Sequence, residues 1–372
     1  MVGNIIKKSN NQTAHIYGGT WAGGSSSALT RTDDAANFPD PVPYYSGMSG
    51  FPSSPFDGLM PWAGIRRLTY SSAGELVEIP KFWFKWTKSG SSIQLQIADA
   101  PVSGFYVSPA HADRGDGVGE RDYVYVGRYH CNSAYKSISG ASPLVSKTRA
   151  EFRNGIHNNN SNMWQWDYAM VWTIRMLYLV EYADWNSRAK IGYGGGNGSS
   201  MQSTGGSNSM PYHTGTSKTS RTTYGVGIQY RYIEDLWANV VDWVDGVYAY
   251  NNYLRVIKNP SNFSDTSGGD NVISLSSASS GNIQSWKKSS VSGYEYMLYP
   301  VPGSSASPTT YCCDFTYTQN LNYSLASVGS AYSKIGQNAS STRGLFYDGY
   351  DMWTSYSICG SRLMVLPSAR IN

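Results

Sequence analysis

The sequence feature that most constrains the fold is one long apolar segment, "YAMVWTIRMLYLVEYADW", at residues 168–185. Its side chains are apolar on nearly every face of a helix, so a helix over about residues 164–185 is expected in the interior of the protein. Arg175 and Glu181 interrupt the segment, and no run of about 18 apolar residues occurs elsewhere. A buried helix is therefore favoured over a membrane span, and no membrane insertion is expected. The first residues lack the long apolar core of a secretory signal, so any export is expected to use another route.

A second helix is predicted over residues 148–159, because Thr148 and Glu151 have the spacing of a capping box. Residues 75–88 are partly alternating and rich in aromatic and β-branched side chains, which predicts one strand with residues 91–99 as its hairpin partner. A Gly- and Ser-rich loop follows at 192–217, and the remaining chain shows short strand-like segments separated by polar stretches. Two helices with many short, mostly antiparallel strands and long loops predict an α+β fold.

The composition favours recognition over nucleic-acid binding. The chain carries 30 Tyr, 12 Trp and 39 Gly, which suits rigid irregular loops and exposed contact surfaces. Only 15% of the residues are charged, the net charge is +4, and the Lys and Arg residues are scattered rather than clustered. A nucleic-acid partner is therefore not expected.

No metal, cofactor or catalytic activity is expected. The four cysteines lack zinc-site spacing, and neither a nucleophile elbow nor a phosphate-binding loop occurs. The segment 112–122, "ADRGDGVGERD", has enough carboxylates for calcium, but a polar turn is the favoured interpretation. Within it, the tripeptide beginning at Arg114 is typical of integrin ligands, and an exposed turn is again favoured.

The stretch "RGLFYDGYDMWTSYSICGSRLMV", residues 343–365, begins and ends like a strand but is polar and aromatic in between. Tyr and Trp give large contact areas at small entropy cost, and short polar side chains adapt their hydrogen bonds. We therefore predict an exposed binding surface on a scaffold whose Leu345, Phe346, Leu363 and Val365 point inward, the alternative being that the tyrosines merely cover loose loops. The predicted ligand-binding residues are Tyr332, Ser333, Tyr347, Asp348, Tyr350, Asp351, Trp353, Thr354, Ser355, Tyr356 and Ser357.

Residues 231–247, "RYIEDLWANVVDWVDGV", resemble a core motif of the formylglycine-generating-enzyme type of C-type lectin fold. That motif is close to D-hydrophobic-x-G-N-V-W-E-W-V, and here Ala238, Val241 and Asp242 replace its Gly, Trp and Glu. Independently of the resemblance, Trp243 is predicted to be a core residue. The oxidising activity of that family is not implied, because the cysteine pair that it needs is missing.

Residues 327–363 resemble the variable region of proteins diversified by retroelements, among them the tropism determinants of phages. Adenine-directed mutagenesis in that family yields mainly small polar residues and Tyr, and residues 322–358 have this bias, with no Glu and the single lysine Lys334. The positions that match the family's fixed residues are Gly329, Gly336, Asn338, Ala339, Gly344, Phe346, Gly360, Arg362 and Leu363.

The resemblances imply a C-type lectin-like domain over residues 71–372, with a variable region at about 323–363. Residues 1–70 are expected to be irregular and either to join that domain or to mediate attachment and assembly. The implied function is ligand or receptor binding in a phage or prophage tail, outside the cell on the virion. The implied partners are a host-surface receptor or other macromolecular ligand, other tail proteins and, in a homotrimer, further copies of the chain. A diversified binding protein on a bacterial surface and a degenerate lectin-fold enzyme are the alternatives.

Overall fold

The computed structural model shows a mostly β protein. The described residues are 13–194, 201–277, 279–318, 321, 324–328, 343–352 and 357–371. The structure is 34% strand and 10% helix. Within the described residues the strands form four sheets, and the three α-helices have only 9, 15 and 4 residues.

The prediction of an α+β, C-type lectin-like fold is therefore wrong. The two predicted helices exist, but they are a small part of the chain and strands dominate. The physical reason is that many strands are two to five residues long and pair with partners far along the chain, so they leave little local periodicity in the sequence.

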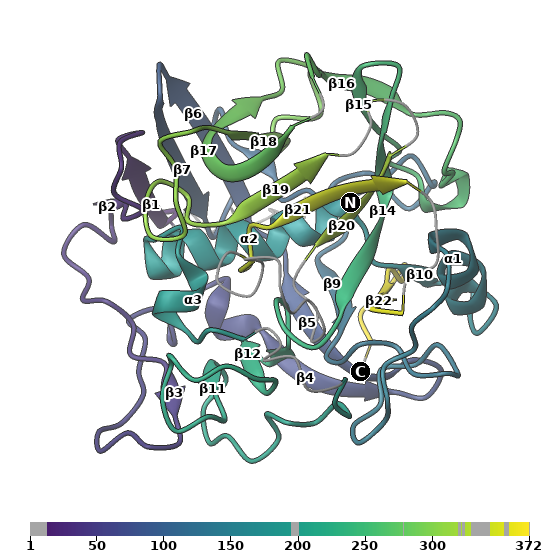
Figure 1. Ribbon diagram of the computed structural model, residues 1–372, viewed down its shortest axis with the longest axis horizontal. Coiled ribbons are helices and arrows are strands. Elements are labelled where there is room, and N and C mark those ends of the chain that lie inside the picture. The colour runs from purple at the N-terminus through teal and green to yellow at the C-terminus, as the bar shows by residue number, and fades with distance from the viewer. Residues whose placement is uncertain are drawn as a thin grey trace, which may run out of the picture.

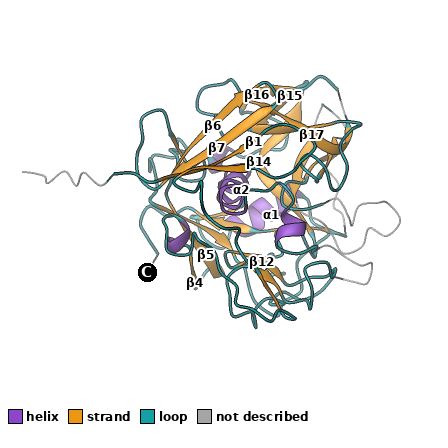
Figure 2. Cartoon of the chain, turned by 90° about the vertical axis from the view of Figure 1, so that its left-hand side faces the viewer, coloured by secondary structure: helices purple, strands orange, loops and turns teal. Residues whose placement is uncertain are grey.

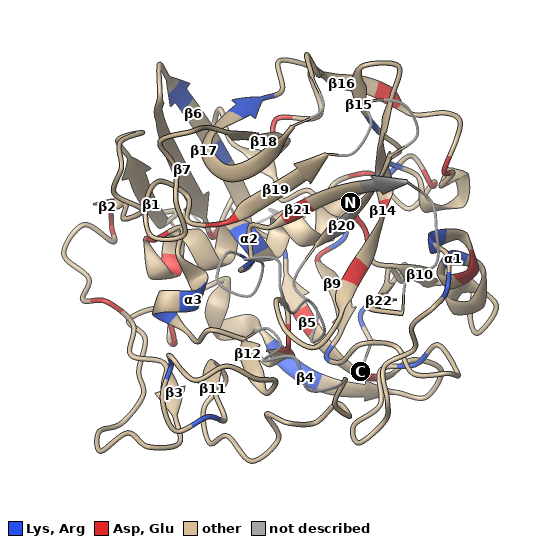
Figure 3. Ribbon diagram, in the orientation of Figure 1, with Lys and Arg blue, Asp and Glu red and all other residues tan. Residues whose placement is uncertain are grey.

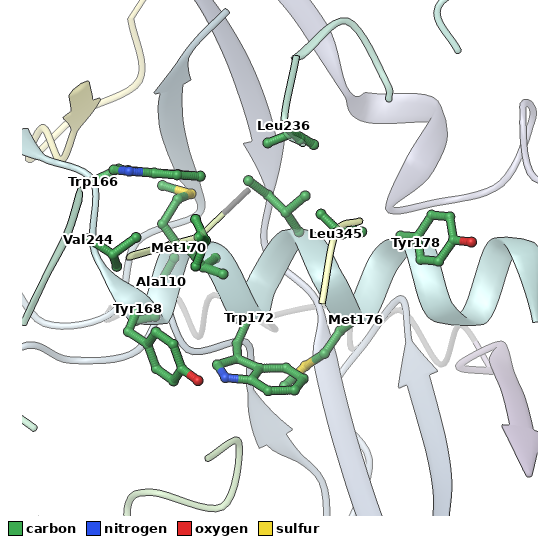
Figure 4. Close-up of a cluster of buried hydrophobic side chains, with 14 of the residues drawn as sticks. Ala110, Trp166, Tyr168, Met170, Trp172, Met176, Tyr178, Leu236, Val244 and Leu345 are labelled. Atoms are coloured by element: carbon green, nitrogen blue, oxygen red, sulfur yellow. The ribbon is translucent and has the colours of Figure 1, made fainter. Parts of the chain in front are cut away.

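Helix α2 (Tyr168–Tyr182) lies at the centre of the protein, between layers of strands (Figures 1 and 2). All 15 of its residues are buried, as the apolar sequence predicts. Asp167 caps its N-terminus, and Ala183, in the left-handed conformation, ends it. Figure 4 shows Trp172 and Met176 on one side of this helix and Leu236 and Leu345, from distant parts of the chain, on the other; all four belong to one buried core.

Helix α1 (Arg149–His157) begins at the predicted capping box. The Thr148 side chain accepts from the Glu151 N–H, and the Glu151 side chain accepts from the Thr148 N–H. Both reciprocal bonds are present, so this prediction is confirmed. The third α-helix, α3 (Ser187–Lys190), follows α2 after a short connection.

The first sheet has the strand order β2–β1–β7–β6–β8, with antiparallel pairs throughout. The predicted hairpin is confirmed as β6 and β7, but residues 75–88 form two strands in two different sheets instead of one. The strands of this sheet are β1 (Ile16–Trp21), β2 (Thr30–Asp33), β6 (Trp83–Ser89), β7 (Ser92–Ala98) and β8 (Tyr106–Val107).

The second sheet has the order β10–β23–β9–β5–β4 and joins distant parts of the chain. Its strands are β4 (Arg66–Tyr70), β5 (Gly74–Pro80), β9 (Tyr123–Gly127), β10 (Met163–Gln165) and β23 (Leu363–Val365). A third, smaller sheet has the order β13–β12–β11–β3. Its strands are β3 (Tyr44–Tyr45), β11 (Gly215–Thr216), β12 (Ile228–Tyr230) and β13 (Ile233–Glu234).

The largest sheet has the order β16–β15–β14–β20–β21–β19–β17–β18, with β22 paired to β14 off this path. Its longest strand is β14 (Val241–Tyr250), which contains the buried Trp243, so the core interpretation of that residue is confirmed. The other strands are β15 (Tyr253–Val256), β16 (Asp270–Ser274), β17 (Ser280–Lys288), β18 (Leu298–Pro302), β19 (Phe315–Thr318), β20 (Ser324–Val328), β21 (Asp348–Met352) and β22 (Cys359–Ser361). Two 3-10 turns, η1 (Trp62–Gly64) and η2 (Pro260–Asn262), complete the described elements.

The N-terminal part of the chain is built into the same sheets. Strand β1 pairs with β7, and β3 pairs with β11. Residues 13–70 are therefore continuous with the main body of the protein.

Charged residues of both signs are distributed over the strands and loops (Figure 3). Several of them lie inside the protein, including Arg175 and Glu181 of α2. Within the described chain, no helix has both the length and the apolar character needed to cross a membrane.

Candidate ligand-binding site

The C-terminal segment is tied to three different parts of the protein. Strand β21 lies between β20 and β19 in the interior of the largest sheet. Strand β22 pairs with β14, and β23 lies between β10 and β9 in the second sheet. Each stretch of the predicted binding surface that the structure describes is therefore held by long-range backbone hydrogen bonds.

The prediction of exposed ligand contacts is wrong for Tyr347, Asp348 and Tyr350. Their side chains are buried, with exposures of 2%, 1% and 0%. Tyr350 packs at 5.6 Å from the Tyr299 ring, and its hydroxyl donates to Tyr168 Oη at 3.4 Å. The reason is the position of β21 inside a sheet that packs on α2, which the local sequence does not reveal.

Asp348 is part of a buried ion pair with α2. Its Oδ1 accepts from Arg175 Nη2 at 2.7 Å, and its Oδ2 accepts from the Tyr168 hydroxyl at 2.6 Å. Burial, and after it the Asp348 carboxylate, raises the pKa of Tyr168 well above its ordinary value. Tyr168 therefore stays protonated and serves as a hydrogen-bond donor to Asp348.

The other predicted site residues divide into two groups. Ser357 is exposed, as a contact residue would be, and Asp351 pairs with Leu325 through the backbone of β21. The remaining predicted residues lie outside the described part of the chain: Tyr332, Ser333, Trp353, Thr354, Ser355 and Tyr356.

The four apolar scaffold positions point inward, as predicted. Leu345 is 5% exposed, and Phe346, Leu363 and Val365 are fully buried. The Phe346 ring packs against Trp185 at 4.8 Å between ring centres. These residues fix the flanks of the predicted variable region in the core.

Gly344 and Gly360 are close-packed against neighbouring chain. A Cβ at Gly344 would lie 2.5 Å from Ser187 Oγ, and one at Gly360 would lie 3.0 Å from the Leu144 carbonyl oxygen. Any larger residue at Gly344 forces its neighbours to move. Both positions are among those predicted to be fixed.

Asp314 holds the start of the C-terminal segment. Its Oδ1 accepts from the Gly344 N–H at 2.5 Å, and its Oδ2 accepts from the Phe346 N–H at 2.7 Å. Burial raises the pKa of this carboxyl from 3.8 to about 7, although the two N–H donors act in the opposite direction.

This raised pKa predicts a specific pH dependence of stability. Between pH 3.8 and about 7 the folded state retains a proton that the unfolded chain has released. The contribution of Asp314 to the free energy of unfolding therefore falls as pH rises through this window, by up to about 1.4 kcal/mol per pH unit, and levels off above it. Denaturant unfolding of the wild type and Asp314→Asn between pH 5 and 8 tests this. A plot of the free energy of unfolding against pH should fall less steeply for Asp314→Asn than for the wild type. Identical slopes for the two proteins would contradict the raised pKa of Asp314.

A cavity of about 220 Å³ lies beside this region, at the N-terminus of α2. Tyr168 lines it and also bonds to Asp348, so the cavity adjoins β21. In its wall the buried Arg114 donates from Nη2 to Asp167 and from Nε to the Lys258 carbonyl at 2.8 Å. Arg114 Nη1 has no partner in the described chain. The wall also carries the acidic residues Asp113, Glu120 and Glu295. The cavity is therefore lined by charges of both signs, and such a lining favours an uncharged polar ligand over an ion.

The prediction of an exposed turn at the tripeptide that begins at Arg114 is wrong for Arg114 itself, which is only 3% exposed. The polar-turn interpretation of the surrounding segment is confirmed, because Asp113 Oδ1 accepts from the Gly115 N–H and Asp116 Oδ1 from the Val118 N–H. The only sign of a buried arginine in the local sequence is one Arg among several carboxylates. That sign does not predict burial, because the partner Asp167 lies 53 positions away in the sequence.

The cysteines are free and buried. Burial raises the pKa of the Cys313 thiol to about 12, and that of Cys131 even further. Thiols with such pKa values carry little of the thiolate character that nucleophilic catalysis needs. Among the residues that the structure describes, no three His, Cys, Asp or Glu side chains are grouped so as to hold a metal ion.

No protein-family model matches this chain, and no curated protein sequence matches it. Function is therefore inferred from the residues and their geometry.

Proposed function

We propose that this protein binds a macromolecular ligand through its C-terminal region, and that the region is diversified by a retroelement. Burial of the predicted fixed positions is the observation that carries the proposal. Gly344, Phe346, Gly360, Arg362 and Leu363 are all buried and close-packed. A region that changes its sequence without unfolding needs such anchors.

The anchors bracket two stretches of the predicted variable region. Strand β20 ends at Val328 and the chain is again held at Gly344, so residues 329–342 start and end on fixed structure. Likewise β21 ends at Met352 and β22 begins at Cys359, on either side of residues 353–356. Recognition residues concentrate in segments that a rigid scaffold positions. Trp353 and Tyr356 belong to the second stretch and have the side chains most typical of contact residues.

The resemblance of residues 327–363 supports a more specific role, a receptor-binding protein of a phage or prophage tail. Its ligand is then a molecule on the host surface, and other tail proteins and further copies of this chain are its assembly partners. Gene context tests this part directly. A reverse-transcriptase gene and an adenine-rich near-copy of the 3′ end are expected beside the gene, with variation among close relatives confined to residues 323–358. Close relatives that carry neither feature would contradict diversification.

Binding itself is tested with purified full-length protein and cells of the bacterium that carries the gene or is infected by the phage. The double substitution Trp353→Ala and Tyr356→Ala is expected to weaken cell binding at least tenfold, because aromatic contact residues dominate interface energies. Phe51→Ala is the matched control, since Phe51 is 93% exposed and distant in sequence. Equal binding by the double variant and the control would contradict the proposal, as would a loss of binding that merely follows a loss of folded protein.

A further inference from the structure

The cavity of about 220 Å³ at the N-terminus of α2 has the features of a ligand-binding site in its own right. A dry cavity of roughly 150 Å³ already holds one benzene molecule, so this one is large enough for a six-membered ring with small substituents. Its lining residues come mainly from β8, the end of β15, the start of α2 and the segments 109–120 and 293–296. Of the lining residues that the structure describes, none lies within residues 323–363.

Tyr296 presents an unused hydroxyl group in this cavity. The residue lines the wall and is only 7% exposed. Within the described chain its hydroxyl has no hydrogen-bond partner, yet the oxygen atom is accessible, unlike that of the fully enclosed Tyr178. Since the rest of the side chain is buried, the accessible oxygen faces the cavity. Burial also raises the pKa of Tyr296, so the hydroxyl stays protonated and can both donate and accept.

Glu295 and Lys258 add an acceptor and a donor to the same wall. Glu295 Oε1 accepts from the Gly293 N–H at 2.9 Å, whereas its Oε2 is accessible and has no partner in the described chain. The Lys258 ammonium lies 4.2 Å from the centre of the Tyr294 ring, and no described carboxylate lies within 4.0 Å of it. Both charged groups are therefore available to a ligand.

The other charges of the wall do not make the cavity a site for an ion. Arg114 is paired with Asp167, and Glu120 Oε2 lies 3.7 Å from Lys81 Nζ. Asp113 is the remaining acid, so free groups of both signs line the space. An ion of either sign would meet a like charge there as well as an opposite one. A ligand without net charge that both donates and accepts hydrogen bonds matches such a wall.

An aromatic surface lies beside these polar groups. Tyr106 on β8 is 46% exposed, and its ring centre lies 6.0 Å from that of Phe84 on β6. Both rings line the cavity. An exposed tyrosine gives a large apolar face at small entropy cost. The wall thus combines an apolar face with hydrogen-bonding groups, and a sugar ring has the same division, with C–H groups on its faces and hydroxyls along its edge.

We infer that this cavity binds one neutral six-membered sugar ring. The C–H face of the ring packs on Tyr106, while its hydroxyls donate to Glu295 Oε2, accept from Lys258 and bond to the Tyr296 hydroxyl. Each sugar hydroxyl is a donor and an acceptor at once, so one ring satisfies a carboxylate, an ammonium group and a phenol together. The inference does not depend on the proposed function, because no residue of the predicted variable region takes part.

The test is calorimetric titration of the full-length protein with methyl glucoside, methyl mannoside and methyl galactoside, which differ in the orientation of their hydroxyls. Saturable binding of at least one of them is expected. The uronate and the amino sugar of the best-bound ring carry one negative and one positive charge, and both are expected to bind more weakly than the neutral ring. Uracil, a neutral flat ring without such hydroxyls, is expected to show no saturable binding.

Tyr296→Phe removes a single oxygen atom and is expected to weaken binding of the best-bound sugar at least about fivefold, with the unfolding midpoint unchanged. Tyr106→Ala removes the aromatic face and is expected to weaken it at least about tenfold. Tyr253→Phe is the matched control, because Tyr253 is 37% exposed and does not line the cavity, and it is expected to leave binding unchanged.

Three results would overturn the inference. The first is the absence of saturable binding for all three methyl glycosides. The second is equal or tighter binding of the uronate, the amino sugar or uracil. The third is an unchanged sugar affinity in both Tyr296→Phe and Tyr106→Ala.

Discussion

Replacement of Arg362 by Met is expected to lower the free energy of unfolding by about 3–5 kcal/mol, because the substitution leaves the buried Asp242 carboxylate without its guanidinium partner and removes the hydrogen bonds to three carbonyl groups. Arg362 is fully buried. Its Nε donates to Asp242 Oδ2 at 3.0 Å, and its Nη1 donates to the Arg128 carbonyl at 3.1 Å. Its Nη2 reaches the carbonyls of Glu234 and Asp235 at 2.5 and 3.0 Å.

Urea unfolding, followed by fluorescence and far-UV circular dichroism, measures this loss. Arg362→Lys is expected to be destabilised as well, since one ammonium group cannot reach acceptors spread around a planar guanidinium. Arg370→Met is the control at an arginine that is 44% exposed, and it is expected to cost clearly less than Arg362→Met, because its partner Glu78 keeps the bonds from Arg66 and Tyr125. A midpoint for Arg362→Met equal to that of the control would show that Arg362 does not hold the C-terminal segment to the core.

The pair formed by Arg175 and Asp348 is expected to have an effect of similar size. Both groups are buried, and Arg175 also donates to the Leu345 carbonyl at 2.9 Å and the Tyr347 carbonyl at 3.1 Å. Asp348→Asn leaves the guanidinium charge unbalanced in the core, with an expected cost of about 3 kcal/mol or more. Arg175→Met leaves the Asp348 carboxylate with only the Tyr168 hydroxyl as donor and no opposite charge, and it removes the bonds to two carbonyls, with a comparable cost.

A double-mutant cycle separates the ion pair from the rest of the contacts. The variant with both substitutions should lose clearly less stability than the sum of the two single losses, because no charge is then left unpaired. Strict additivity of the two losses would contradict direct coupling. The same cycle tests the placement of Asp348, since an exposed contact residue would show a small single effect and no coupling to Arg175.

Local features of the fold were predictable from the sequence. The Thr148 and Glu151 pair specifies where α1 begins, because both capping bonds form within four residues of chain. The β6–β7 hairpin is predictable for the same reason, since its strands are joined by a short turn. The fold class was not predictable in this way. Strand β10 pairs with β23, so that Met163 lies opposite Val365, and no local sequence pattern predicts such a pairing.

In the candidate site, too, some features were predictable from the local sequence and others depend on distant residues. The inward direction of Leu345, Phe346, Leu363 and Val365 follows from their apolar side chains alone. The burial of a Tyr or an Asp cannot be predicted from its side chain alone. Either residue is stable on the surface, and either is also stable in the core when a hydrogen-bond partner is present. The burial of Asp348 depends on Arg175, which lies 173 positions away in the sequence.

By itself, the sequence determined that residues 168–182 form an interior helix, because a segment that is apolar on every face has no surface on which to lie. It also determined that the C-terminal segment has strand-like apolar ends. Only the tertiary structure decided which polar groups enter the core with them. Arg175, Glu181 and Arg362 are buried because partners from distant strands and loops supply their hydrogen bonds. A buried charge is stable only when such partners are brought to it, and that is a property of the assembled sheets rather than of any one segment.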